Sequence, residues 1–449
     1  MPSYLALLLC FVFVIYLLRH ERNLFPNTSL ASWIPTLWML YCGTRPLALW
    51  FVGDPIEGGG DKEGSLLDRN FLTVLIFVSL VILARRRVDW RVVIKNNGWL
   101  IFLLVYALFS IVWSDYPLVS FKRYIRFAGA FIVGLVILTE INPRETLESV
   151  LRRTIYIIVP FSILLIKYFP LLGVAFHRYS GEAMWVGVTI HKNSLGIVCL
   201  VAMFLIIWNK FRETRHPKLS EKPKRLPDLL VFVIAAFLLS GQGRFYSASC
   251  VAALILGTFV LVGLWWHHRL RNHIGRFLLV IPLVVTFFIG ISMPLLGPTA
   301  FEGVFEVLGR DATLTGRTEI WAALVPKFEN QPLLGAGFGS FWIGGTILGV
   351  KEAHSGYLEV LLQLGLAGIL IIVSLSFSFC LQCHRALTSK LDWEAFGYCF
   401  ILMSALHNVA NASFLETSDL MWTILVLLMI VLSQSSGNRP AVLVDQSHG

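Results

Sequence analysis

The sequence predicts an all-α fold, a polytopic transmembrane helical bundle of about 12–13 spans. Three observations predict it: 56% of the 449 residues are hydrophobic, only 14% are charged, and the apolar residues fall in long runs. Soluble domains usually contain about 25% charged residues. Inside hydrocarbon the backbone must satisfy its own hydrogen bonds, which leaves helices or a closed barrel. The runs are continuous and do not alternate as barrel strands would, so we expect helices.

Thirteen apolar segments are the candidate helices. A span needs about 20 mainly apolar residues, and two of the segments, 4–18 and 229–239, are short by this measure. The segments lie at residues 4–18, 31–51, 71–84, 98–113, 121–139, 154–172, 186–208, 229–239, 245–266, 277–293, 356–380, 396–409 and 420–432.

These segments divide the chain into four parts. We expect an N-terminal transmembrane bundle at 1–293 and a long periplasmic loop with short helices at 294–355. C-terminal transmembrane helices would follow at 356–434, and the polar residues 435–449 would form a disordered tail. Arg19 and Arg22 directly follow the first apolar segment, and no basic residue precedes it, so we interpret that segment as a retained anchor.

The formal net charge of +10 would also suit a nucleic-acid-binding protein, so the distribution of charge decides. Of the 37 Lys and Arg residues, 23 lie on one side of the predicted spans, 11 on the other and three within segments. Cytoplasmic loops carry the excess of Lys and Arg in membrane proteins. We therefore place the loop 294–355 outside and expect no nucleic-acid partner.

The cysteines predict neither a disulfide framework nor a haem site. Most of the seven lie in apolar segments. The run Cys380-Leu-Gln-Cys383-His384 formally matches a haem-attachment pattern. It lies at the cytoplasmic end of a predicted helix, whereas such haems are attached on the outer side, so we interpret the match as chance.

The first outward-facing polar cluster is His191-Lys192-Asn193, which opens a helix after an outward loop. Free backbone N–H groups and three polar side chains at a helix start suit an anion, and we take all three residues as substrate-binding candidates. The alternative is an ordinary interfacial helix start, in which Asn193 caps the helix and Lys192 extends to the lipid headgroups.

The second cluster is the short outward turn that ends at Arg244. Glycines on both sides of Gln242 would let a ligand approach the backbone closely. A guanidinium group matches phosphate oxygens in a bidentate arrangement. The alternative is an arginine that only extends to lipid headgroups.

The third cluster lies inside the long loop. Thr315 is a candidate N-cap for a helix that contains Arg317, Glu319 and Trp321. Trp321 begins an apolar face at helical spacing, so we expect this helix to lie along the membrane surface and to hold Arg317 over the bundle. A glycine-rich run follows at 335–339, where no strand precedes it, and we interpret it as a turn and not as a nucleotide site.

The fourth cluster is at the end of the loop, where His354 precedes the helix that carries Tyr357. A histidine has an ordinary pKa of about 6.5 and can accept a proton at neutral pH. The alternative is an interfacial histidine bonded to a loop carbonyl. Because two arginines are predicted on the same side, we favour a functional His354.

Together these clusters suit a substrate with a lipid tail and a diphosphate. The tail would lie between helices, the phosphates would meet the arginines, and the sugar would project into an aqueous cavity. No acidic cluster resembles a divalent-metal site, so we expect no metal or other cofactor. Oriented arginine charge could stabilise a departing diphosphate instead.

Four motifs also resemble the O-antigen ligase superfamily, and within it the exopolysaccharide polymerisation branch. They are His191-Lys192-Asn193-Ser194-Leu195-Gly196, Gly316-Arg317-Thr318-Glu319-Ile320-Trp321, Pro332-Leu-Leu-Gly335-Ala-Gly337-Phe338-Gly339 and Ala353-His354-Ser355-Gly356-Tyr357-Leu358-Glu359. Their order and spacing match the family, and the resemblance spans roughly residues 113–416.

The resemblance implies a metal-independent, GT-C-like glycosyltransferase of the bacterial inner membrane with its catalytic face in the periplasm. It implies a polyprenyl-diphosphate-linked oligosaccharide as donor and a glycan or lipid-core hydroxyl as acceptor. Arg244 and Arg317 would hold the diphosphate, and His354 would be the catalytic base. The resemblance also implies a chain-length regulator and export proteins as partners, besides membrane lipids.

Two other classes of protein remain compatible with the sequence. A flippase or permease for the same lipid-linked glycan could use the outward polar residues as a binding vestibule. A non-catalytic subunit of a polysaccharide export complex could use them for assembly. Transporters often contain internal repeats and midplane charges, and the candidates here gather on one side, which favours the enzyme.

Overall fold

The computed structural model describes residues 2–51, 65–86, 88–176, 181–215, 226–243, 246–269, 276–297, 316–343, 345–387 and 392–433. Within these ranges the chain is almost entirely helical, and its two named strands form one short antiparallel hairpin, β1 (Val174–Phe176) with β2 (Ala183–Trp185). The helices are α1 (Ser3–Leu24), η1 (Leu30–Ser32), α2 (Trp33–Gly43), α3 (Leu47–Phe51), α4 (Leu66–Arg85), α5 (Trp90–Asn96), α6 (Gly98–Phe109), η2 (Ser110–Trp113), α7 (Pro117–Leu138), α8 (Pro143–Tyr168), α9 (Pro170–Gly173), α10 (Lys192–Arg215), α11 (Leu226–Ser240), α12 (Ala248–Arg269), α13 (Arg276–Leu296), α15 (Arg317–Asn330), α16 (Gly356–Leu387), α17 (Trp393–Ala410) and α18 (Leu420–Leu432).

Each of the thirteen predicted segments coincides with helix, which confirms the all-α membrane fold. Seven described helices are long and apolar enough to cross a membrane, or up to eight if α5 and the helical stretch after it, which meet at 90°, form one span. This number is lower than the predicted 12–13. One reason is that α7 carries three cations near its start. Another is that α11 and α18 have only 15 and 13 residues.

Helix-breaking residues explain where the structure departs from continuous spans. The segment 31–51 divides into α2 and α3 around Pro46, because proline cannot continue a helix from the preceding turn. In α16, Gly365 has a φ of 65° and interrupts the helical backbone, a conformation that glycine adopts without steric cost. The tail 435–449 and residues 298–315 of the long loop lie outside the described residues.

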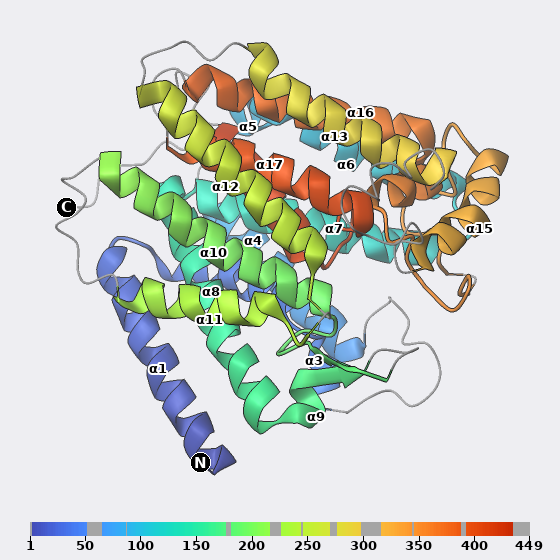
Figure 1. The fold of residues 1–449 in the computed structure, drawn as a ribbon. Coiled ribbons are helices and arrows are strands. Elements are labelled where there is room, and N and C mark those ends of the chain that lie inside the picture. Colours follow the sequence, from blue (N-terminus) through green and yellow to red (C-terminus); the bar gives the residue numbers. More distant parts are fainter. Residues whose placement is uncertain are drawn as a thin grey trace.

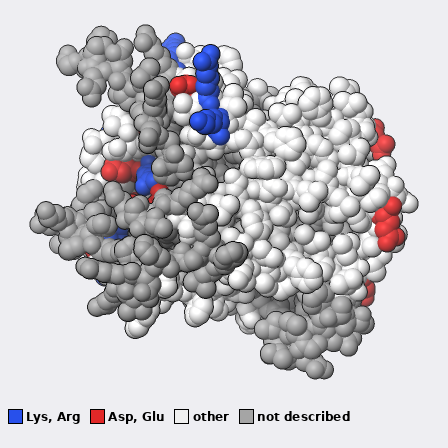
Figure 2. Space-filling model, turned by 90° about the horizontal axis from the view of Figure 1, so that it is seen from above, with Lys and Arg blue, Asp and Glu red and all other residues white. Residues whose placement is uncertain are grey.

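The centre of the bundle is α17, which packs against α12, α13, α16 and α18 (Figure 1). All 13 residues of α18 are buried. By contrast, only 17% and 28% of the most apolar stretches of α1 and α4 are buried. Figure 2 shows a broad band without Lys, Arg, Asp or Glu across one face of the molecule. Such a surface fits a hydrocarbon environment, in which exposed charges are costly.

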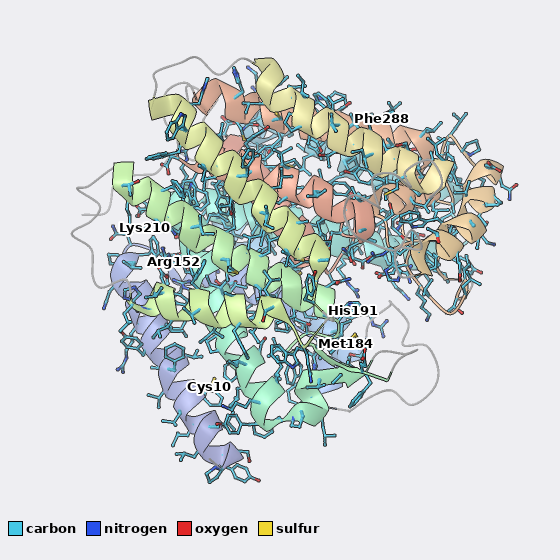
Figure 3. The ribbon with its side chains drawn as sticks, viewed as in Figure 1. Cys10, Arg152, Met184, His191, Lys210 and Phe288 are labelled. Atoms are coloured by element: carbon cyan, nitrogen blue, oxygen red, sulfur yellow. The ribbon has the colours of Figure 1, made fainter. Side chains whose placement is uncertain are left out.

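The two ends of the bundle differ in their polar contacts. His191 and Met184 lie toward one end, and Arg152 and Lys210 lie toward the other (Figure 3). At the latter end, Arg153 Nε lies 2.9 Å from Glu21 Oε2, and both side chains are only 2% exposed. Arg152 Nη1 lies 2.6 Å from Asp228 Oδ1. Because buried charges need partners, these ion pairs fix α1 and α11 against α8.

Candidate functional site

The end of the bundle marked by His191 gathers three segments that carry predicted site residues. His191 directly precedes α10, α15 begins at Arg317, and His354 lies two residues before α16. The helix α15 lies at this end (Figure 1). Its residues Trp321 and Leu324 are buried, as the predicted apolar face requires. The long loop therefore returns to the bundle through α15.

The backbone of Ala353, directly before His354, is held at both its carbonyl oxygen and its N–H. The indole Nε1 of Trp321 donates a hydrogen bond of 2.9 Å to the Ala353 carbonyl oxygen. The Ala353 N–H donates one of 3.1 Å to Oε2 of Glu359. Trp321 is one helical turn beyond Arg317 on α15, and Glu359 is in the first turn of α16. The backbone of Ala353 thus joins the helix of Arg317 to the segment of His354.

His354 occupies a left-handed backbone conformation, with a φ of 50°. Its Nδ1 lies 2.5 Å from Oε1 of Glu352, and its side chain is 22% exposed. The carboxylate of Glu352 is therefore a close acidic neighbour of the imidazole. The geometry gives His354 an accessible imidazole with an acidic partner, as a general base needs.

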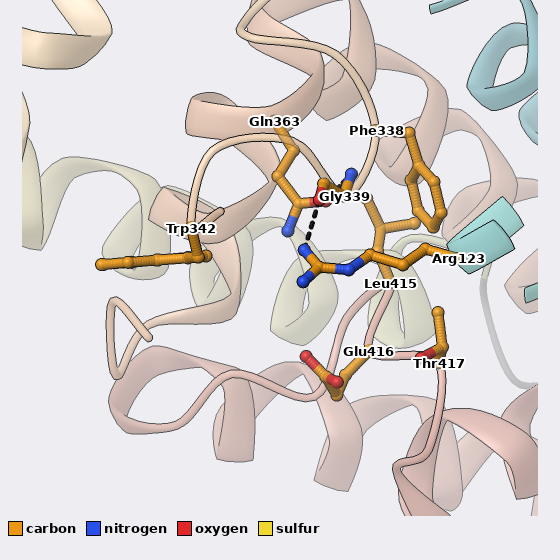
Figure 4. A pocket seen from close by; sticks show the side chains of 8 residues that line it. All are labelled: Arg123, Phe338, Gly339, Trp342, Gln363, Leu415, Glu416 and Thr417. Atoms are coloured by element: carbon orange, nitrogen blue, oxygen red, sulfur yellow. Dashed lines mark hydrogen bonds between the residues drawn. The ribbon is translucent and has the colours of Figure 1, made fainter. Parts of the chain in front are cut away.

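The buried carboxylate of Glu359 connects this segment to a neighbouring pocket. Its Oε1 accepts hydrogen bonds of 2.6 Å from Trp342 Nε1 and 2.8 Å from Gln363 Nε2. Oε1 of Gln363 in turn accepts a hydrogen bond of 2.8 Å from the N–H of Gly339. The carbonyl oxygen of Gly339 accepts a hydrogen bond from Arg123 Nη1 (Figure 4). A continuous chain of hydrogen bonds therefore runs from α7 to the residue before His354.

The pocket itself is polar on several sides. Its lining residues are Arg123, Phe338, Gly339, Trp342, Gln363, Leu415, Glu416 and Thr417 (Figure 4). The glycine-rich run 335–339 is a turn at this pocket, where Gly337 and Gly339 have φ values of 90° and 68°. This confirms the interpretation of the run as a turn. A Cβ on Gly337 would lie 2.8 Å from the Ser110 carbonyl oxygen, so the close approach requires glycine.

Asn193 connects the start of α10 to the last turn of the bundle. Its Nδ2 donates a hydrogen bond of 2.6 Å to Oδ1 of Asn411, and its backbone N–H donates one of 3.3 Å to Nδ1 of His191. Asn411 Nδ2 donates to Ser249 Oγ at 2.7 Å, and the Asn411 carbonyl oxygen accepts the N–H of Gly356 at 2.8 Å. Asn411 thereby ties together the starts of α10, α12 and α16.

The pKa of His191 is influenced by several of the charged residues predicted for the site. Protein around its imidazole desolvates it and lowers its pKa, although residue 191 retains solvent-exposed surface. Glu352 raises the same pKa, and the cations Lys192 and Arg317 lower it, as does His354. These effects indicate that Glu352, His354, Lys192 and Arg317 lie close enough to His191 to interact with it electrostatically.

Trp321 and Tyr357, both predicted as substrate-binding, lie inside the protein. Trp321 is 2% exposed and Tyr357 is fully buried. The Tyr357 hydroxyl donates a hydrogen bond of 2.9 Å to the Ala405 carbonyl oxygen. Glu319 is exposed on the first turn of α15. Arg244 lies outside the described residues, so its predicted position stays a prediction. Within the described ranges, no group of three or more His, Cys, Asp or Glu side chains is placed to hold a metal ion.

Comparison with known proteins shows what the chain is similar to. Residues 230–373 match the family model described as O-antigen ligase. The chain is also 24% identical over 334 residues to the exopolysaccharide production protein ExoQ of Rhizobium meliloti (strain 1021), which covers 69% of this chain and 71% of that protein. Both matches support the resemblance to the O-antigen ligase superfamily that the sequence motifs indicate.

The O-antigen ligase match covers most of the described site. It includes Arg317, Trp321, His354 and Glu359, together with the pocket residue Gln363. The cluster around His191 and the turn at Asn411 lie outside the matched residues but inside the same end of the fold. The apolar helices indicate a multi-pass membrane protein.

Sequence reasoning gave no role to three polar residues of this candidate site. Glu352 lies two residues before His354, and this spacing alone could have suggested a partner for the imidazole. Glu359 belongs to the fourth motif but had no predicted role, although an acidic residue near a predicted helix start requires hydrogen-bond donors. Asn411 could not be recognised from the sequence, because its hydrogen-bond partners Asn193 and Ser249 are distant in sequence.

Proposed function

We propose that the chain is a membrane glycosyltransferase that transfers a polyprenyl-diphosphate-linked glycan to an acceptor sugar hydroxyl in exopolysaccharide or O-antigen biosynthesis. The observation that carries the proposal is the position of His354. Its imidazole is accessible, lies beside Glu352, and shares one end of the bundle with Arg317. A base beside an arginine suits a reaction in which a hydroxyl loses a proton and a diphosphate departs.

In the proposed reaction, Nε2 of His354 removes the proton from the acceptor hydroxyl. The acceptor oxygen then attacks the anomeric carbon of the donor sugar and forms the new glycosidic bond. The bond from that carbon to the diphosphate oxygen breaks, and the diphosphate keeps the electron pair. Attack opposite the leaving group inverts the anomeric configuration. The proton remains on His354, where Glu352 stabilises the imidazolium.

The leaving diphosphate would be stabilised by arginines in place of a metal ion. Arg317 and Arg244 are the proposed diphosphate ligands, and His191 and Lys192 are proposed to add donors, since Arg317 and Lys192 both influence the imidazole of His191. Cationic donors that are already in position stabilise the charge that develops in the transition state, because they do not need to reorganise. The proposal places this site on the periplasmic side of a bacterial inner membrane and assigns the reaction to a metal-independent, GT-C-like mechanism.

The test is an assay of the purified, reconstituted chain with a lipid-linked oligosaccharide and an acceptor. Substituting His354→Ala should reduce turnover by about 10²–10⁴-fold, the usual contribution of a general base. The matched control is His267→Ala, because His267 lies near the far end of α12. If the His354→Ala variant kept wild-type turnover, His354 would not be the general base. Translocation of the substrate without new glycosidic bonds would instead identify a flippase.

A further inference from the structure

A second pocket lies between α4 and α7 on the same end of the bundle as the site. Its lining comes from one face of each helix. The residues are Arg69, Leu72, Thr73 and Ile76 on α4, and Val119, Lys122, Arg123, Ile125 and Arg126 on α7. Apart from Ile125, the two sets follow the spacing of neighbouring positions on a helix face. The pocket is thus the groove between two packed helices.

The charge of this pocket is strongly asymmetric. Four of its nine lining residues are cations, and none of these lining residues is acidic. Arg69 is in the first turn of α4, and Lys122 and Arg123 are in the second turn of α7. The nearby carboxylate of Asp68 is fully buried and accepts hydrogen bonds of 2.7 Å from Leu47 N–H and Ser65 Oγ. The pocket therefore presents a net positive charge to whatever enters it.

The remainder of the pocket and its surroundings are apolar. Leu72, Ile76, Val119 and Ile125 form its walls. The neighbouring side chains Val74, Phe77 and Leu118 are exposed on the outside of the bundle. These exposed apolar residues face lipid in a membrane protein. An occupant would place an anionic group among the cations and a hydrocarbon chain along the walls.

We propose that this pocket binds the phosphate headgroup of a membrane lipid. Guanidinium groups match phosphate oxygens in pairs, and a lysine adds a point charge. A lipid phosphate satisfies both the charge and the apolar walls, whereas a free anion would satisfy only the charge. The proposal does not depend on the proposed glycosyl transfer.

Arg123 links this lipid site to the candidate active site. It lines the pocket between α4 and α7 and also the pocket beside Gln363 (Figure 4). Its Nη1 donates a hydrogen bond to the Gly339 carbonyl oxygen. A lipid phosphate bound near Arg123 would therefore contact the same side chain that supports the glycine-rich turn.

The experiment measures lipid binding to the purified full-length chain by native mass spectrometry. The probes are phosphatidylglycerol, polyprenyl phosphate, diacylglycerol and inorganic phosphate. The test variant is Arg69→Gln/Lys122→Gln, since both residues are exposed and their substitution should leave the fold intact. The matched control is Arg91→Gln/Lys95→Gln, which removes two exposed cations at the other end of the bundle.

We expect saturable binding of one lipid phosphate to the wild type and to the control. The test variant should bind it about tenfold more weakly for each cation removed. Tighter binding of phosphatidylglycerol or of polyprenyl phosphate would identify the source of the lipid. Equal binding of diacylglycerol would overturn the proposal, because no phosphate would be needed. Equal binding of inorganic phosphate, or unchanged lipid binding in the test variant, would overturn it as well.

Discussion

The conformation of His354 depends on its neighbours. A residue other than glycine at a φ of 50° is strained, at a cost on the order of 1–3 kcal/mol. The preceding residue, Ala353, accepts a hydrogen bond from Trp321 and donates one to Glu359. These two hydrogen bonds hold its backbone and so maintain the conformation of His354. If His354 is the base, these two side chains determine where its imidazole points. They are positioning residues and do not need to touch the substrate.

Substituting Trp321→Phe tests this role. The variant keeps an aromatic ring but loses the donor to the Ala353 carbonyl oxygen. A small misplacement of a catalytic group can reduce turnover by about 10²-fold. The loss of one hydrogen bond should cost only about 0.5–1.5 kcal/mol of stability. We expect a large fall in kcat with a small fall in Tm, measured on the same reconstituted protein.

Trp38→Phe is the matched control for that substitution. Trp38 is 1% exposed, and its indole N–H donates to none of the described groups. Both variants lose the same ring volume from a buried position. Equal kcat values in the two variants would show that the indole of Trp321 contributes only packing.

Arg317 provides a second test at the scale of single residues. Substituting Arg317→Lys keeps the positive charge but replaces a planar fork with a point charge. We expect the KM for the lipid-linked donor to rise about tenfold or more, because bidentate contacts to the diphosphate are lost. The control is Lys327→Arg, an exchange in the last turn of the same helix. Unchanged donor kinetics in Arg317→Lys would contradict bidentate binding.

At the scale of elements, the starts of α10, α12 and α16 converge on the turn between α17 and α18. Asn408 Oδ1 accepts the N–H groups of Ser413 and Phe414 at 2.9 and 2.8 Å and so shapes this turn. A Cβ at Gly356 would lie 1.9 Å from the same oxygen. The first residue of α16 must therefore be glycine, because no larger residue fits against Asn408.

Substituting Gly356→Ala should destabilise the protein and displace the start of α16. Overpacking of a buried contact typically costs about 1–3 kcal/mol. A Cβ at Gly263, in α12, would meet no atom within 4 Å, so Gly263→Ala is the control. Alanine favours helix over glycine by about 0.5–1 kcal/mol, so the control should be neutral or stabilised. Thermal unfolding in detergent compares the two, and equal Tm values would show that the turn yields to accommodate the methyl group.

The apolar runs allowed the long apolar helices to be placed, because burial in lipid requires continuous apolar sequence, whereas the short helix α5 lies outside every predicted segment. The break between α2 and α3 and the bend between α5 and α6 were not predicted, since tertiary packing decides whether a chain continues through such points. In the site, the charged residues could be recognised because charge is costly near a membrane. The role of the Ala353 backbone could not be recognised, because the function of a backbone group leaves no signature in the sequence.

At the scale of the whole molecule, the two ends of the bundle differ in the roles of their charged residues. One end holds buried ion pairs, in which Arg153 and Glu21 satisfy each other and Ser32 Oγ accepts a further hydrogen bond of 2.8 Å from Arg153. Removing one partner of a buried pair costs about 3–5 kcal/mol, so this end contributes to stability. The other end leaves His354 accessible and gathers cations around it. The proposed reaction needs that second end to face the side on which its glycan substrates reside.

The orientation of the two ends in a membrane follows from the distribution of Lys and Arg. The predicted cytoplasmic side carries 23 of the 37 such residues. The test uses the full chain with a single added cysteine, Glu319→Cys at the site end or Lys95→Cys at the other. Both residues are exposed, whereas five of the seven native cysteines are buried. In intact cells a membrane-impermeant maleimide should label Glu319→Cys above the wild-type background and leave Lys95→Cys unlabelled until the membrane is permeabilised. The reverse pattern would place His354 in the cytoplasm, and the proposed transfer would then need a donor on that side.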